Sequence, residues 1–425
     1  MKIAEVNMVD YGSTGNIMLQ IADCAIDHGH EVRTFSKKWR KQTEKRKYHS
    51  YYGTTLENGI HVVLSRLIGF QGLFSYFGTK SLVRELEKFQ PDIIHLHNLH
   101  DSSTCLPVLF KYISKNSIKT VWTLHDCWAF TGQCPHFTMV KCDKWKTKCH
   151  DCPQKAARLP IDCSSWMWER KKKWFTSVKD MVIVTPSEWL AGLIKESYLK
   201  GYPVEVINNG INLDVFKPFE SHHPLKKRKN LVLGVALGWG QRKGLDTIVK
   251  LRGKLDSDYQ MLLVGVDESV KAVLPDGIDA INRTDNQKQL AEIYSAADVF
   301  INPTREDNFP TTNIESIASG TPVITFDVGG SKEMLDSTCG EALPPDDIDS
   351  LVSEIIRVCT TKPYTQTACV TRGRNFDMNR KFMEYVTLFE DFRGGVHAYE
   401  LIILCPYSLR ISLIQRQSVS YRKAC

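Results

Sequence analysis

The stretch from Ile301 to Ile324 combines two carboxylates with the predicted start of a helix. Asp307 lies in a polar loop after an apolar strand, and Glu315 falls within the first turns of the helix that Pro310 opens. Loop amides and the positive end of a helix favour an anion such as a diphosphate, and flanking carboxylates can bind sugar hydroxyls. The stretch indicates such a site, or a helix whose acidic residues only complement its dipole. The residues expected around the anion are Asn308, Phe309, Pro310, Thr311, Thr312 and Glu315.

A second loop, Gly238-Trp-Gly-Gln-Arg-Lys-Gly244, follows a predicted strand and leads into another helix. Lys243 comes directly before Gly244 and the start of this helix, so we expect its ammonium group to stabilise the oxygens of a departing phosphate. Arg242 either assists Lys243 or is a solvated basic side chain. Because cationic side chains can supply this charge, we expect no catalytic metal ion.

Histidines follow two predicted strands of the amino-terminal half. His125 comes directly after the strand over 120–124. It is placed either to enter a cleft between domains or to serve as an ordinary hydrogen-bonded loop residue. His97 and His100 are better suited to shaping a pocket for an acceptor than to acid–base work.

Four cysteines are closely spaced in the pattern C-x7-C-x6-C-x2-C. Four soft ligands with a closing C-x-x-C fit a tetrahedral structural Zn²⁺; reduced thiols and a redox role are the alternatives. The chain has thirteen cysteines, an odd number, and its start does not read as an export signal, so we do not expect a disulfide framework. The predicted metal ligands are Cys134, Cys142, Cys149 and Cys152.

Two series of alternating strands and helices position these residues. The first opens with a strand over 2–8, a turn containing Gly12 and Gly15 that suits a diphosphate, and a helix over 16–28. The glycine spacing alone is a weak signal. Further strands are expected over 92–97, 120–125 and 181–185, then over 231–237, 260–265, 299–302 and 323–326. The pattern predicts an α/β protein with two Rossmann-like domains facing each other across a cleft.

The predicted boundaries are a first domain over 1–216, a polar linker over 217–229 and a second domain over 230–377. A helix over 378–393 is expected to pack back on the first domain. The tail over 394–425 is either a poorly ordered terminus or a membrane-surface element.

The composition limits the class of protein. Of 425 residues, 42% are hydrophobic and 24% charged, which excludes a disordered or coiled-coil chain and favours a cytoplasmic globular enzyme. The net charge of +7 is mild for a nucleic-acid-binding protein of this size. Basic residues cluster beside tryptophans at 37–47 and at 166–174, either as solvated faces or as docking surfaces for an anionic membrane.

The spacing Asp307-x7-Glu315, followed by Ser319-Gly-Thr-Pro-Val-Ile324 and Val328-Gly-Gly-Ser-Lys-Glu333, resembles retaining nucleotide-sugar glycosyltransferases of the GT-B fold. The resemblance covers most of the chain and is closest to bacterial enzymes that assemble O-antigen, capsule or colanic acid. Further segments fall in family order: Pro91–Asn98, Thr123–Asp126, Val184–Trp189, Val206–Asn212 and Tyr294–Phe300.

The resemblance implies roles for individual residues. Asp307 would contact hydroxyls of the donor sugar and Glu315 the ribose, while Lys243 would bind the diphosphate and His125 would lie near the donor sugar. Two positions depart from the family. Asp307 is one methylene shorter than the usual glutamate and has Glu306 beside it, and the usual arginine is replaced by Leu237 or Gly238, so that Arg242 would stand in for it.

The same resemblance implies a UDP- or GDP-sugar donor, retention of anomeric configuration, and a lipid-linked oligosaccharide acceptor bound by the first domain. It implies a cytoplasmic enzyme at the inner face of the membrane and no nucleic-acid partner. Three rivals stay open: a nucleotide-sugar epimerase of the same fold, a basic zinc-bearing nucleic-acid-binding protein, and a catalytically silent scaffold.

Overall fold

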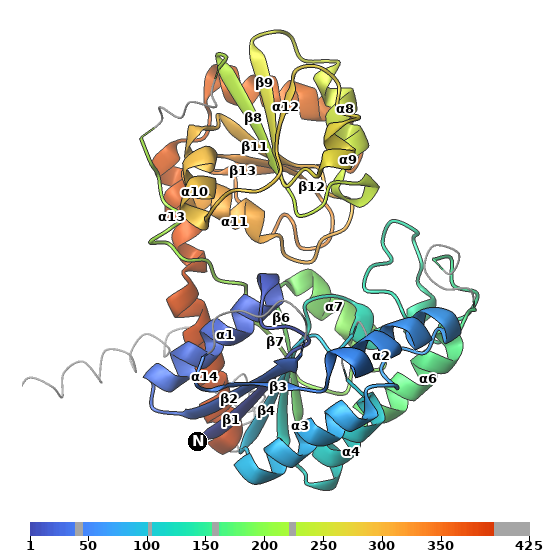
Figure 1. Ribbon diagram of the computed structural model, residues 1–425. Helices are drawn as coiled ribbons and strands as arrows, with labels where there is room; N and C mark the ends of the chain where they lie inside the picture. The colour runs from blue at the N-terminus through green and yellow to red at the C-terminus, as the bar shows by residue number, and fades with distance from the viewer. Residues whose placement is uncertain (39–45, 101–103, 155–160, 221–226, 395–425) are drawn as a thin grey trace, which may run out of the picture.

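The computed structural model describes residues 1–38, 46–100, 104–154, 161–220 and 227–394. It contains two parallel sheets, one in each half of the chain, each flanked by helices (Figure 1). The first is seven-stranded, in the order β3-β2-β1-β4-β5-β6-β7. Its strands are β1 Lys2–Val6, β2 Glu31–Lys37, β3 His49–Tyr52, β4 Ile93–Leu96, β5 Lys119–Thr123, β6 Met181–Thr185 and β7 Val204–Val206.

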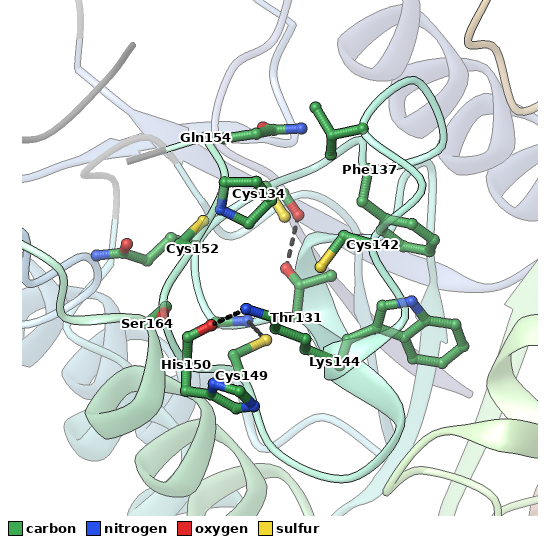
Figure 2. A pocket seen from close by; sticks show the side chains of 15 residues that line it. Thr131, Cys134, Phe137, Cys142, Lys144, Cys149, His150, Cys152, Gln154 and Ser164 are labelled. Atoms are coloured by element: carbon green, nitrogen blue, oxygen red, sulfur yellow. Dashed lines mark hydrogen bonds between the residues drawn. The ribbon is translucent and has the colours of Figure 1, made fainter. Parts of the chain in front are cut away.

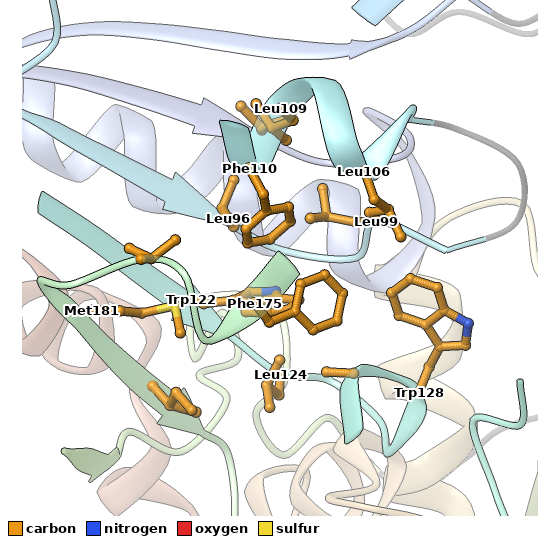
Figure 3. Close-up of a cluster of buried hydrophobic side chains, with 14 of the residues drawn as sticks. Leu96, Leu99, Leu106, Leu109, Phe110, Trp122, Leu124, Trp128, Phe175 and Met181 are labelled. Atoms are coloured by element: carbon orange, nitrogen blue, oxygen red, sulfur yellow. The ribbon is translucent and has the colours of Figure 1, made fainter. Parts of the chain in front are cut away.

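Alternating side chains bury both faces of this sheet. On one face, Leu96 of β4 and Trp122 of β5 pack with Phe110 and Phe175 from the covering helices (Figure 3). On the other face, Ile93 belongs to a separate cluster. The helices are α1 Gly12–Asp27, α2 Thr55–Ile68, α3 Tyr76–Phe89, α4 Leu106–Lys115, α6 Ser164–Phe175 and α7 Glu188–Glu196.

The second sheet is six-stranded, in the order β10-β9-β8-β11-β12-β13. Its strands are β8 Asn230–Val235, β9 Tyr259–Val264, β10 Ile278–Ile281, β11 Val299–Asn302, β12 Val323–Phe326 and β13 Gly340–Leu343. Its helices are α8 Leu245–Arg252, α9 Glu268–Lys271, α10 Gln287–Ala296, α11 Thr311–Ala318, α12 Ile348–Thr361 and α13 Gln366–Gly373.

The strand order reverses between β1 and β4 in the first sheet and between β8 and β11 in the second. Loops that leave the carboxyl ends of two such strands diverge and leave a crevice, the usual ligand site of open α/β sheets. The loop after β8 carries Lys243, and the loop after β11 carries Asp307. The topology therefore brings two predicted site residues to one edge of one sheet.

The helix α14, Met378–Gly394, follows the second domain in sequence but packs on the first. In Figure 1 it runs, in red, down beside α1. Phe382 and Phe389 of α14 lie in one buried cluster with Ile17 and Ile21 of α1. Lys119 donates from its Nζ to the carbonyl oxygen of Phe392 at 2.6 Å.

Most predicted strands coincide with observed ones to within two or three residues. The elements that were not predicted are the strands β3, β7, β10 and β13 and the helices α2, α6, α7, α9, α12 and α13. Two lysines of the predicted basic clusters are buried rather than surface-exposed, Lys37 and Lys171. Trp39, Arg40, Lys41 and Lys45, linker residues 221–226, and the tail from residue 395 lie outside the described residues.

Candidate active site

The loops after β8 and β11 meet at an ion pair. The Nζ atom of Lys243 lies 2.5 Å from Oδ2 of Asp307, and each side chain is about a fifth exposed, at 18% and 20%. Gly244 makes the approach possible: its φ is +75°, and a Cβ atom there would lie 2.2 Å from the carbonyl oxygen of Pro303. The two predicted residues are thus adjacent and open to solvent.

Arg242 binds the backbone of the same loop. Its Nη1 donates to the carbonyl oxygen of Glu306 at 3.0 Å, and its own carbonyl accepts from the amide of Arg305 at 2.9 Å. The side chain therefore fixes the course of the chain toward Asp307 and is not simply solvated.

The helix α11 begins at Thr311, directly after this loop, and the side chain of Pro310 provides no capping hydrogen bond. Glu315 lies one turn further along, where its Oε2 accepts from the hydroxyl of Tyr294 at 3.2 Å. Burial raises the pKa of Glu315 to about 7, although hydrogen bonds from Tyr294 and Thr311 act in the opposite direction. Phe309, by contrast, packs its side chain in the core of the second domain.

Two side chains of this loop reach across to the first domain. Asn308 accepts from Oγ of Ser187 at 2.5 Å and donates to the carbonyl oxygen of His125 at 3.2 Å. Glu306 accepts from Oγ1 of Thr138 at 3.0 Å and from the amide of Met139 at 2.7 Å. The loop that carries Asp307 is therefore held by both domains.

A further interdomain contact was not predicted. The carboxylate of Glu333 accepts from the amides of Glu188 and Trp189, both at 2.8 Å. These amides belong to the first turn of α7, where orphan donors and the helix dipole attract a carboxylate. Glu333 thus completes the cap that Ser187 begins.

On the first domain, His125 stacks on His97. Its Nε2 lies 3.1 Å from Nδ1 of His97, and Nε2 of His97 lies 3.4 Å from the buried Oε2 of Glu5. Burial lowers the pKa of His125 to about 4 and that of His97 to about 3. Both rings are neutral near pH 7, so they act through hydrogen bonds rather than as cations.

His100 and Asp126 line a small cavity at the ends of β4 and β5, together with His97 and His125. Nε2 of His100 lies 2.9 Å from Oδ2 of Asp126. Burial alone would raise the pKa of Asp126, but the interaction with His100 and the amide of Trp128 outweighs it and holds the pKa at about 2. The cavity therefore presents a charged carboxylate, paired with His100, beside the neutral imidazoles of His97 and His125.

The remaining predicted residues lie elsewhere. Gly12 has a φ of +70° where α1 begins after β1, and a Cβ on Gly15 would meet the carbonyl carbon of Asp10 at 2.6 Å, so both positions require glycine.

Cys134, Cys142, Cys149 and Cys152 line a separate cavity between β5 and α6 (Figure 2).

Two family models match this chain. The model of Glycosyltransferase Family 4 covers residues 14–215, and that of Glycosyl transferases group 1 covers residues 229–361. One falls on each domain, and together they span most of the chain. The chain belongs to the glycosyltransferases of family 4 and group 1.

Relatives of this glycosyltransferase include the putative colanic acid biosynthesis glycosyl transferase WcaC of Escherichia coli, which is 24% identical over 83% of this chain and 89% of its own length. The lipopolysaccharide glucosyltransferase WaaG of the same organism is 22% identical over 37% of this chain and 44% of its own length.

Solved structures share the fold. Sucrose-phosphate synthase from Thermosynechococcus elongatus aligns with a TM-score of 0.70 at 18% identity, over 93% of this chain and 99% of that chain. Anabaena HepE in complex with UDP-glucose aligns with a TM-score of 0.62 at 13% identity, over 91% and 99%. The predicted GT-B fold, two parallel sheets with flanking helices, is confirmed.

Proposed function

We propose that this glycosyltransferase moves a hexosyl group from a UDP- or GDP-sugar to a lipid-linked oligosaccharide, with retention, during synthesis of a cell-surface polysaccharide. The observation that carries the proposal is the Lys243–Asp307 pair at the amino end of α11, facing the first domain. The names of WcaC and WaaG support the pathway class, and HepE, which binds UDP-glucose, supports the donor class.

In the proposed donor complex the diphosphate lies at the first turn of α11. Lys243 would leave Asp307 for the departing phosphate, and Asp307 would then be free to bind a sugar hydroxyl. Glu315 would accept from the ribose. Glu306 already accepts two hydrogen bonds from the first domain, which favours Asp307 over Glu306 as the acid that contacts the sugar.

Without a protein nucleophile, retention would proceed by approach of the acceptor hydroxyl to the face of the sugar from which the diphosphate leaves, as the family resemblance implies. The bond from the anomeric carbon to the phosphate oxygen breaks, the bond to the acceptor oxygen forms, and the acceptor proton passes to the departing phosphate. The neutral ring of His97 and the charged Asp126 would line the acceptor side and orient its hydroxyl, and the neutral ring of His125 would lie near the donor sugar. Holding both substrates in one cleft lowers the entropic barrier.

A surface of the first domain suits an anionic membrane. In α2 the polar Asn58, His61 and Ser65 are buried, and an apolar stripe faces outward. The stripe consists of Leu56, Ile60, Val63 and Leu67, each at least half exposed. The end of α2 adjoins α6, because Sγ of Cys163 lies 3.0 Å from the carbonyl oxygen of Ile68. The exposed cations of α6 are Arg170, Lys172 and Lys173. An apolar stripe beside cations is typical of interfacial helices.

Within the described part of the chain, no helix has the length and apolar character needed to span a bilayer. We therefore expect reversible docking through the stripe. Val63→Glu and Leu67→Glu should each reduce co-sedimentation with vesicles containing anionic lipid by roughly tenfold or more, because each removes an apolar contact with the bilayer that docking would bury. Val273→Glu, at an exposed site of the second domain, is the matched control and should bind as before. If vesicle binding depended neither on the stripe residues nor on anionic lipid, docking through this surface would be excluded.

Ligand-dependent melting tests the proposed function most directly. UDP or GDP at one hundred times its dissociation constant should add about 2.7 kcal/mol to the stability of the full chain and raise its melting temperature. A short oligonucleotide should leave it unchanged. The preferred nucleotide then directs a donor screen with a lipid-diphosphate acceptor, in which NMR of the product reports the anomeric configuration. Stabilisation by the oligonucleotide and not by either nucleotide would favour the nucleic-acid alternative.

A further inference from the structure

A cysteine-rich loop, residues 131–154, occupies the connection between β5 and α6. The sulfur atoms of its four cysteines point toward one small cavity (Figure 2). Phe137 and Trp145 also line this cavity. Four sulfur atoms from one loop, directed at one space, form the donor set of a structural zinc site.

Burial raises the pKa of Cys134, Cys149 and Cys152, and a backbone amide opposes this effect at Cys149. The amide of Gly132 donates to Sγ of Cys149 at 3.2 Å. Amide donors to coordinating sulfur atoms are the outer-shell contacts that hold ligands in place and tune a metal site.

A buried lysine side chain lies close to the cysteines. Lys171 is 0% exposed; its Nζ donates to the carbonyl oxygen of Trp128 and lies 3.7 Å above the Trp128 ring. Among the described residues, no carboxylate lies within ion-pair distance of Lys171. Burial lowers the pKa of its ammonium group to about 7, and negative charge on the sulfur atoms of Cys149 and Cys134 raises it. Four thiolates around Zn²⁺ carry a net charge of −2, and a buried ammonium group beside them offsets part of it.

The cavity is more open than a loaded site. A tetrahedral Zn²⁺ with bonds of about 2.3 Å places its sulfur atoms roughly 3.8 Å apart. In the described part of the chain, no three of these sulfur atoms lie within 4.8 Å of one another. Binding would therefore draw the four side chains inward and tighten the loop.

The loop also contacts the candidate active site. Thr138 and Met139, which lie between Cys134 and Cys142, both donate to the carboxylate of Glu306. Glu306 is 6% exposed and directly precedes Asp307. Whatever fixes the cysteine loop thus also fixes the chain at Asp307.

We propose that Cys134, Cys142, Cys149 and Cys152 bind one structural Zn²⁺, and that the metal-held loop positions Asp307 by clamping Glu306. The metal site is independent of the reaction. The positioning role of Glu306 rests on the proposed function.

Metal content tests the first part. The full chain, purified without chelator, should contain one zinc per chain. Cobalt substitution should give the absorption of tetrahedral thiolate coordination. Cys142→Ser and Cys152→Ser should lose the metal and melt at lower temperature, whereas Cys24→Ser, a cysteine outside the loop, should retain it. If the serine variants do not fold, a second experiment takes their place. A mercurial reagent is used to release zinc from the intact wild-type chain, and the melting temperature is then measured. If the chain contained no metal after expression in a medium with added zinc, and its melting temperature did not depend on zinc, the proposed site would be wrong.

Substitution of Glu306 tests the clamp. Glu306→Ala should retain full zinc content, and its KM for the donor should rise about tenfold or more. Glu306→Gln, which keeps one carbonyl acceptor, should recover part of the loss. An unchanged KM in Glu306→Ala, measured on active enzyme, would overturn the clamp and leave the zinc site standing. If the chain contained zinc but were inactive with every donor tested, the result would count against the proposed function alone.

Discussion

Lys243→Ala is expected to lower the turnover number by about 10²–10³-fold, the usual cost of removing one preorganised charge from a site where negative charge develops. In the free enzyme the ammonium group is paired with Asp307 at 2.5 Å. In the proposed donor complex a diphosphate at α11 would offer it a stronger partner, so its stabilising effect would arise as the leaving group departs. Steady-state kinetics with the best donor of the screen measures the loss.

Lys250→Ala is the matched control for this loss. Lys250 also lies beside an aspartate, with its Nζ 4.0 Å from Oδ2 of Asp246, but its side chain is 61% exposed on the outside of α8. Its removal should leave turnover within about twofold, since exposed pairs contribute little. If both variants kept normal turnover, the silent-scaffold alternative would gain and our assignment of the leaving-group site would be wrong.

The fold could be predicted because its main strands are continuous apolar runs. Met181–Thr185 is buried at every position, and such runs separated by helical stretches specify parallel sheets. The unpredicted α2 has the opposite pattern, with polar residues inside and Leu56, Ile60, Val63 and Leu67 outside. Periodicity locates an apolar face but does not say whether protein or another surface covers it.

The donor side of the site was predictable because it is local in sequence. A strand, a polar loop and a helix start are read within a dozen residues around Asp307. Glu333 contacts two amides of α7 that lie 144 and 145 positions away in the sequence. Glu5 contacts His97, which lies 92 positions away. A carboxylate at such a position has no local signal, because its partner is chosen by the docking of one domain or strand on another. Glu333 and the start of α7 both fall in segments that carry the family resemblance, Val328–Glu333 and Val184–Trp189, but the order of these segments does not say that they meet.

Glu315→Gln should have opposite effects on activity and on stability. Glutamine keeps the shape but loses the charge that strengthens a hydrogen bond from the ribose, so donor affinity should fall about 10–100-fold, the equivalent of roughly 1.5–3 kcal/mol. Titration with the preferred nucleoside diphosphate measures the fall. Glu341→Gln, at an exposed position of the same domain, should bind the nucleotide normally.

The stability effect of Glu315→Gln follows from the raised pKa. Burial raises the pKa of Glu315 from 4.5 to about 7, so the folded chain resists ionisation that the unfolded chain accepts. The wild type therefore loses stability as pH rises from about 4.5 through 7, and glutamine removes this loss. Melting of the variant should exceed that of the wild type by roughly 2–4 °C at pH 8, as expected for about 3 kcal/mol in a chain of 425 residues, and match it below pH 4.5. If the variant were less stable than the wild type at pH 8, Glu315 would support the fold. Its carboxylate would then not be a group whose ionisation costs stability and serves donor binding.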